Sequence, residues 1–198
     1  MIGASTHPVG PLLMWLGWDR VERVCREGSG HHRLDPQGEP YCQDTAVMLC
    51  KTAGGALLKI RDDMVSSRPG CSTNWVLQGT RGSFDSGRGG FYELDVMRVW
   101  AEELRPEHKW LTLADVADEY LPEAWRVADA EARGGHGGSD YFVMSDFVVM
   151  VAGERPNPID VHRALDMKLP CLISQQSIHE DARWLEVPDS RDWQVRES

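Results

Sequence analysis

The amino-acid sequence predicts an α+β fold in which helices pack on one face of an open antiparallel (mixed) sheet. Two pairs of apolar strands, each joined by a short glycine turn, indicate β-hairpins, which belong to antiparallel sheets. The first hairpin is expected over residues 46–61, with Gly54 and Gly55 in its turn, and the second over residues 73–85 around the turn 79–82. The helical patterns gather later in the chain, so helices and strands should be segregated rather than alternate.

The other elements follow from local patterns and punctuating residues. A helix is expected to begin near Pro8 and to end before Gly17, because proline is favoured in the first turn and glycine just past the last. Asp160 is expected to cap a later helix, which Pro170 should kink or end because proline lacks a backbone N–H. The expected helices are 8–16, 113–120, 123–133, 141–152, 160–168 and 171–180, and the expected further strands are 20–27, 93–100 and 183–187.

The composition limits the classes of protein that this chain can belong to. Its 198 residues are 41% apolar, which predicts a single domain over residues 1–198. A net charge of −10 argues against nucleic acid and anionic membranes as partners, because neither attracts an acidic surface. No apolar run is long enough to span a membrane and the first residues do not have the pattern of a secretory signal, so we expect a cytoplasmic protein.

The cysteines and histidines give no signal for a metal site. The five cysteines include no CxxC pair, and no HExxH occurs. We therefore expect free thiols in a reducing compartment and no bound metal.

A glycine-rich segment at residues 133–142, RGGHGGSDYF, precedes a very apolar stretch. Small residues around His136 permit unusual backbone angles and the close approach of a ligand. Ser139 or Asp140 is expected to cap the helix that begins near Tyr141. That helix is apolar almost all round, which is typical of a buried helix.

Five short motifs carry a resemblance to a known family. They are THPVGP at 6–11, SSRP at 66–69, GTRG at 79–82, HGGSDY at 136–141 and PIDV at 158–161. In order and spacing they resemble the second domain of the glucose-fructose oxidoreductase and inositol dehydrogenase superfamily, and within it glycoside hydrolase family 109. The resemblance runs through most of the chain.

This resemblance implies an amino-terminal Rossmann domain that binds NAD, followed by a sheet domain that forms one wall of the substrate cleft. The present sequence has no GxGxxG after a strand, so NAD is expected in the full-length family and no cofactor in this chain alone. The implied chemistry is glycoside hydrolysis by transient oxidation at C3 and elimination. The implied partners are a small carbohydrate, an upstream Rossmann polypeptide and a second copy bound through the sheet face.

The resemblance also selects candidate site residues. His7 is the candidate for a contact to a sugar hydroxyl or for proton transfer, because imidazole titrates near neutral pH. Tyr141, His136 and Arg68 are the candidates for substrate binding. Three of them have an ordinary structural alternative, namely a loop hydrogen bond for His7 and His136 and a solvated turn for Arg68.

Two other functions remain open on the sequence alone. The same domain can belong to a sugar or polyol dehydrogenase that uses NAD(P), which net accumulation of NADH would distinguish. It can also be a non-catalytic module that dimerises through its sheet. Among the tryptophans, Trp18 is the one candidate for stacking on a sugar, since large aromatic residues usually serve a core or an interface.

Overall fold

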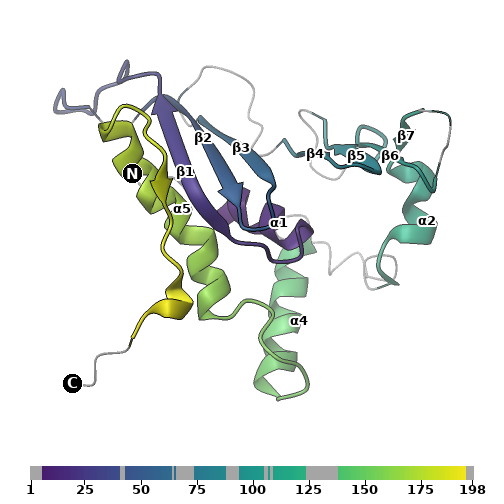
Figure 1. Ribbon diagram of the computed structural model, residues 1–198. Helices are drawn as coiled ribbons and strands as arrows, with labels where there is room; N and C mark the ends of the chain where they lie inside the picture. Colours follow the sequence, from purple (N-terminus) through teal and green to yellow (C-terminus); the bar gives the residue numbers. More distant parts are fainter. Residues whose placement is uncertain are drawn as a thin grey trace. The chain divides into compact units, whose positions relative to one another are not determined.

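Two four-stranded antiparallel sheets and their helices make up the protein, which confirms the predicted α+β class (Figure 1). The computed structural model describes residues 6–40, 43–63, 65, 74–87, 94–104, 107, 109–123 and 138–194. The chain divides into two units, one formed by Met1–Ser67 with Pro158–Ser198 and the other by Arg68–Asn157. Each unit is described by itself.

The sheet of the first unit has the strand order β3-β2-β1-β8. Its strands are β1 (Val21–Gly28), β2 (Thr45–Thr52), β3 (Leu57–Asp63) and β8 (Leu185–Glu186). The predicted first hairpin is confirmed, with Cys50 opposite Leu58 and a left-handed Gly55 (φ 90°) in the turn. Side chains alternate along β2, so that Met48 and Cys50 are buried while Val47 is exposed on the other face.

Helices α1 (Thr6–Trp15) and α5 (Val161–His179) cover the buried face of this sheet, and α5 runs beside β1 (Figure 1). The core between them contributes about 1.5–3 kcal/mol for each large apolar side chain removed from water. Its members are Val9, Leu13, Val21, Val24, Met48, Cys50, Leu58, Ile60, Leu169 and Val187.

Helix α5 continues without interruption through Pro170. Of the two effects expected of this proline, a kink or an end of the helix, the end was therefore wrong. Proline removes one helical hydrogen bond and crowds the preceding turn. Pro170 is fully buried, however, and its neighbours Leu169 and Cys171 are buried as well. Packing of this stretch against the sheet offsets the lost hydrogen bond, which local sequence rules do not include.

The Asp160 cap is confirmed, because its carboxylate accepts a hydrogen bond of 2.9 Å from the backbone N–H of Arg163. This hydrogen bond lowers the pKa of Asp160. A lowered pKa stabilises the fold above the ordinary carboxyl pKa, and the stabilisation is lost as the pH falls through the lowered value.

We expect Asp160→Ala to lower the Tm by about 2–4 °C at neutral pH, because an unpaired helix amide replaces the cap. The difference from the parent protein should shrink at about pH 3, where the native carboxyl is increasingly protonated. Calorimetric scans of both proteins at neutral pH and at about pH 3 measure the difference in Tm. A difference in Tm that is the same at both values would contradict the assignment of the cap to the ionised carboxylate.

The sheet of the second unit consists of β4 (Val76–Gln78), β5 (Gly82–Asp85), β6 (Arg98–Ala101) and β7 (Leu111–Thr112) in sequential order. The predicted second hairpin is confirmed, and its turn is closed by a hydrogen bond of 2.8 Å from the N–H of Gly79 to the carbonyl of Gly82. The strand expected at 93–100 begins later, because residues 94–96 form a turn.

The helical part of the second unit differs from the expectation at several points. The helix expected at 113–120 is split into η1 (Ala114–Val116) and α2 (Ala117–Tyr120). The helix expected at 123–133 lies almost wholly outside the described residues.

Helix α4 (Ser139–Val151) begins two residues before Tyr141, where its start was predicted. Gly138 occupies the capping position with a φ of 95°, and Ser139 and Asp140 lie inside the first turn. The expectation of a cap at Ser139 or Asp140 was therefore wrong. Only glycine adopts such a backbone angle without strain, which explains a glycine at this capping position. The described residues of its own unit bury none of the residues of α4, so the expected burial of this helix stays a prediction.

No helix among the described residues is both long enough and apolar enough to cross a lipid bilayer.

Candidate functional site

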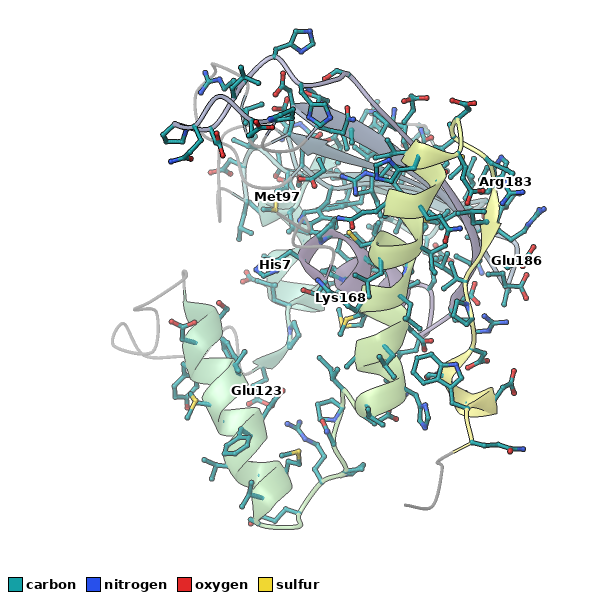
Figure 2. All side chains as sticks on the ribbon, turned by 90° about the vertical axis from the view of Figure 1, so that its left-hand side faces the viewer. His7, Met97, Glu123, Lys168, Arg183 and Glu186 are labelled. Carbon is teal, nitrogen blue, oxygen red and sulfur yellow. The ribbon has the colours of Figure 1, made fainter. Side chains whose placement is uncertain are left out.

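His7 lies in the first turn of α1, and its side chain is exposed at the end of the helix (Figure 2). The rest of the THPVGP motif holds this turn in place. Val9 is fully buried in the core, and a Cβ on Gly10 would lie 2.6 Å from the Sδ of Met167 on α5. The glycine thus allows α1 and α5 to approach closely, and the motif fixes the position of His7 through packing.

A proline near the start of α1 removes one of its hydrogen bonds. Pro11 lies inside the helix, four residues after His7. Because proline has no backbone N–H, it cannot donate the usual helical hydrogen bond to the His7 carbonyl. The imidazole of His7 is therefore exposed at a helix end where one regular helical hydrogen bond is missing.

The other end of α1 turns sharply into β1. Gly17 and Trp18 are both left-handed, with φ values of 71° and 64°, and the Trp18 N–H donates to the Leu13 carbonyl at 2.7 Å. A bulky residue with positive φ is held there by its surroundings. The guanidinium of Arg163 lies 4.7 Å from the centre of the Trp18 ring. One face of this candidate stacking residue is thus occupied by a cation.

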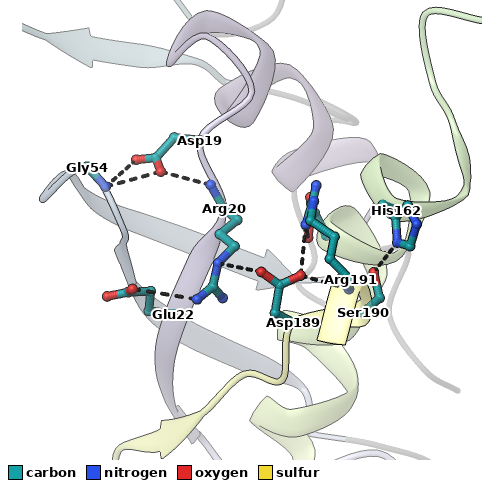
Figure 3. A network of polar contacts seen from close by, with 9 residues as sticks. Asp19, Arg20, Glu22, Gly54, His162, Asp189, Ser190 and Arg191 are labelled. Atoms are coloured by element: carbon teal, nitrogen blue, oxygen red, sulfur yellow. Dashed lines mark hydrogen bonds and ion pairs between the residues drawn. The ribbon is translucent and has the colours of Figure 1, made fainter. Parts of the chain in front are cut away.

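A polar network joins the loop after α1 to the end of the chain (Figure 3). Asp19 accepts hydrogen bonds from the N–H of Gly54 at 3.0 and 3.1 Å, and Arg20 pairs with Asp189 at 3.2 Å. Asp189 also accepts from the backbone N–H of Arg191, which is the main cause of its lowered pKa. These contacts position the C-terminal segment beside the sheet.

The same network continues onto α5. Arg191 donates to both carboxylate oxygens of Asp166, at 3.2 and 2.7 Å, and this bidentate contact is the main cause of the raised pKa of Arg191. Asp166 is buried, while Arg191 is partly exposed. One turn earlier, His162 shares a hydrogen bond of 2.8 Å with Ser190. No pattern in the sequence indicated these pairs.

Arg26 is a second residue that the sequence analysis missed. It lies on the covered face of β1, where its guanidinium is 3.3 Å from Asp62 and 3.5 Å from Ser174. Its side chain is only 10% exposed, and its Nε has no hydrogen-bond partner among the described residues. A buried charge of this kind requires partners, and here it fixes α5 against β1.

Of the other three predicted site residues, the structure describes only Tyr141. Tyr141 lies in the first turn of α4, is 53% exposed and makes an edge-to-face contact with Phe142 at 5.4 Å. His136 and Arg68 lie outside the described residues. His7 and Tyr141 belong to different units, so the common sugar site of these four residues stays a prediction.

An open hollow lies on the second unit. Asp85, Arg98 and Trp110 line this hollow of about 320 Å³. Asp85 and Arg98 are opposite each other on β5 and β6. A carboxylate, a guanidinium and an indole ring are groups that bind polar ring compounds, and the sequence analysis did not single them out.

The described residues do not fit a dinucleotide or a metal ion. Within the described part of the chain, no group of three histidine, cysteine or acidic side chains is placed to hold a metal. Strand pairing is antiparallel in both sheets, whereas a dinucleotide site needs parallel strands with a glycine-rich turn leading into a helix. We therefore assign no step of chemistry to a cofactor held by these residues.

Solved structures of similar fold are about twice as long as the present chain. A NAD binding oxidoreductase from Klebsiella pneumoniae matches 93% of this chain and 49% of its own, with a TM-score of 0.67 and 16% identity. A levoglucosan dehydrogenase in complex with NADH and L-sorbose matches 94% of this chain and 49% of its own, also with a TM-score of 0.67 and 16% identity. At this identity the likeness shows the fold.

Sequence relatives give the family. A glycosyl hydrolase family 109 protein from Stenotrophomonas maltophilia is 31% identical over 93% of this chain, and an alpha-N-acetylgalactosaminidase from Tannerella forsythia is 26% identical over 93%. The chain spans 42% and 41% of the lengths of these two relatives. The model of the family "Glycosyl hydrolase 109, C-terminal domain" matches residues 23–194, across both units. The chain therefore belongs to glycosyl hydrolase family 109, of which it carries the C-terminal domain.

Proposed function

We propose that the chain forms the sugar-binding wall of a cytoplasmic, NAD-dependent glycosidase that cleaves N-acetylhexosamine glycosides by transient oxidation at C3 and elimination. The family match over residues 23–194 is the observation that carries this proposal. The chain corresponds to 42% of a relative's length and its described residues do not fit NAD. Cleavage should therefore require a second polypeptide or domain that holds the cofactor.

The role of this chain is to bind the sugar and to move protons. His7 is exposed on a turn whose neighbours Val9 and Gly10 are fixed in the core. A rigidly held imidazole can donate to or accept from a sugar hydroxyl and can transfer its proton. Tyr141, on the first turn of α4 in the other unit, is 53% exposed and offers a phenol for a sugar hydroxyl.

The test is a fusion of this chain to the part of the Stenotrophomonas maltophilia relative that precedes its matched region. With NAD and a chromogenic N-acetyl-α-galactosaminide, the fusion should release the leaving group without net accumulation of NADH. Fluorescence titration with NADH reports cofactor binding separately. A fusion that binds the cofactor but never cleaves a glycoside would refute the proposal, and net NADH formation would favour a sugar dehydrogenase.

We further propose that two copies of the chain associate through the uncovered face of the β1–β3 sheet. Three apolar side chains are at least 38% exposed on this face. They are Val47 on β2, Leu57 on β3 and Trp184, which directly precedes β8. Lys51, Lys59 and Arg23 share this face with Glu27 and Glu186, so a second copy can meet both apolar and oppositely charged groups.

Val47→Glu should convert an associated protein into a monomer, because it replaces an apolar side chain of that face by a carboxylate. Leu172→Glu is the matched control, since Leu172 is equally exposed, at 38%, but lies on α5 over the opposite face. Sedimentation velocity at several protein concentrations measures the change. The sheet-face association is disproved if the parent protein sediments as a monomer, or if both variants change it alike.

A further inference from the structure

The first half of helix α5 carries two neighbouring rows of side chains with different partners. At 3.6 residues per turn, His162 and Asp166 lie on one row, and Arg163 and Met167 lie on the adjoining row. The first row contacts the C-terminal segment, residues 187–193, and the second row contacts α1 and the residue that ends its turn. Because one helix carries both rows, a rotation of α5 changes both sets of contacts together.

The row of His162 and Asp166 is held by the C-terminal segment (Figure 3). His162 shares a hydrogen bond of 2.8 Å with Ser190, and Arg191 donates to both carboxylate oxygens of Asp166. The Asp166 side chain is only 7% exposed. A buried carboxylate without its partner is strongly unfavourable, so loss of the Arg191 fork would turn α5 to bring Asp166 closer to water.

The row of Arg163 and Met167 holds helix α1. The Sδ of Met167 lies against Gly10, where a Cβ would be only 2.6 Å away. The guanidinium of Arg163 lies 4.7 Å from the centre of the Trp18 ring, just beyond the other end of α1. Gly10 follows His7 by three residues on the same helix, so a shift of Met167 moves the turn that carries the imidazole.

The C-terminal segment also reaches the loop after α1 directly. Asp189 pairs with Arg20 at 3.2 Å and accepts a hydrogen bond from the backbone N–H of Arg191. The contacts form a closed ring, from α1 to α5, from α5 to the C-terminal segment, and from there to the loop that follows α1. All members of the ring belong to the first unit.

We propose that Asp166 and Arg191 are positioning residues for His7. Their fork fixes the rotation of α5, α5 fixes α1 through Met167 and Gly10, and α1 holds the imidazole where a sugar hydroxyl reacts. This inference rests on the proposed function, which assigns proton transfer to His7. It adds that the last residues of the chain, which do not contact His7 in this arrangement, control its activity.

The placement of His7 can be followed by NMR in this chain without any activity. Spectra of histidine-labelled protein show the imidazole signals, and their loss in His7→Ala assigns those of His7. Arg191→Ala should shift the His7 signals, although Arg191 acts on His7 only through α5 and α1. The signals of His32, which pairs with Asp44 in the loop between β1 and β2, should stay in place and serve as the internal reference.

Kinetics of the fusion test the consequence for catalysis. Arg191→Ala should lower kcat about 10–100-fold, the cost of a small misplacement of a reacting group, with little change in KM. In the His7→Ala background the same substitution should lower kcat by no more than about twofold, because the residue that it positions is already gone. A general structural defect would instead multiply the two losses.

Two further variants complete the design. Arg183→Ala is the matched control, since Arg183 forms an exposed ion pair with Glu180 beyond the end of α5, and it should leave both kcat and the His7 signals unchanged. Arg191→Lys keeps a positive charge near Asp166 without the two-pronged contact, and it should show the same changes in smaller size. Circular dichroism checks the fold, and Arg191→Lys decides the question if Arg191→Ala does not fold.

The outcomes separate this inference from the proposed function. Unmoved His7 signals in the Arg191 variants, or losses of kcat that multiply, overturn the positioning role even if the fusion cleaves glycosides. A fusion that binds NADH but cleaves no glycoside refutes the proposed function. Shifted His7 signals in the same variants would then still uphold the coupling between the C-terminal segment and His7.

Discussion

Replacement of His7 by alanine is expected to lower kcat of the fused, cofactor-holding protein by a factor of about 10²–10⁴, the usual contribution of a positioned acid or base. His7 is exposed at the start of α1, so the alanine removes a reactive imidazole without opening a cavity. KM should change much less than kcat if the imidazole acts mainly in proton transfer. Steady-state kinetics of the fusion give both constants.

His179→Ala is the control for this prediction. His179 is also an exposed histidine at the end of a helix in the same unit, where it belongs to α5. Its removal should leave kcat within about twofold, because His179 is the last residue of α5 and lies twelve residues beyond Met167, which contacts the THPVGP turn. Equal losses in the two variants, or no loss at His7, would remove His7 from the catalytic machinery. A pH profile that keeps its shape in His7→Ala would do the same.

The largest expected effect on stability is that of Leu13→Ala, which should lower the free energy of unfolding by about 2–5 kcal/mol. Leu13 is 0% exposed in the core between α1, α5 and the sheet, so its truncation removes apolar contacts and leaves a cavity. Urea unfolding followed by circular dichroism measures the change.

Met14→Ala is the neighbouring control, because Met14 is 51% exposed on the same helix. Its truncation should cost no more than about 0.5 kcal/mol. Similar costs at the two positions would mean that α1 does not pack on the sheet as described. A loss of about 2–5 kcal/mol of unfolding free energy in Leu13→Ala would also support the fixed placement of His7, which lies in the same helix.

Local sequence patterns were sufficient to predict the two hairpins. Residues 46–50 in β2 are an apolar run, Leu58 and Ile60 alternate with polar residues in β3, and Gly55 provides the left-handed angle that their turn uses. The same is true of the Asp160 cap, where the residue type and its position before a helix are both visible in the sequence. Motifs in register were also sufficient to indicate the family, which the match over residues 23–194 confirms.

Contacts between distant parts of the chain could not be read from local patterns. The continuity of α5 through Pro170 depends on burial against the sheet, and the Asp166–Arg191 pair depends on where the last residues return. Arg26 looks like any surface arginine of a strand until α5 is placed over it. Helix propensity and periodicity contain none of this information.

The burial of α4 stays a prediction for a different reason. Its apolar residues occur almost all round the helix, and periodicity alone assigns such a helix to a core. The pattern does not say whether the covering surface belongs to the same chain.

The first unit is built from the two ends of the chain, Met1–Ser67 and Pro158–Ser198. On the ribosome, β1, β2 and β3 therefore emerge well before α5 and β8, which cover and extend their sheet. At about 5–20 residues per second, the intervening residues delay that cover by roughly 5–20 s. During this interval the part of the apolar face that α5 covers and the edge of β1 are in water, so chaperone binding and the translation rate should affect the yield of native protein more than the final stability does.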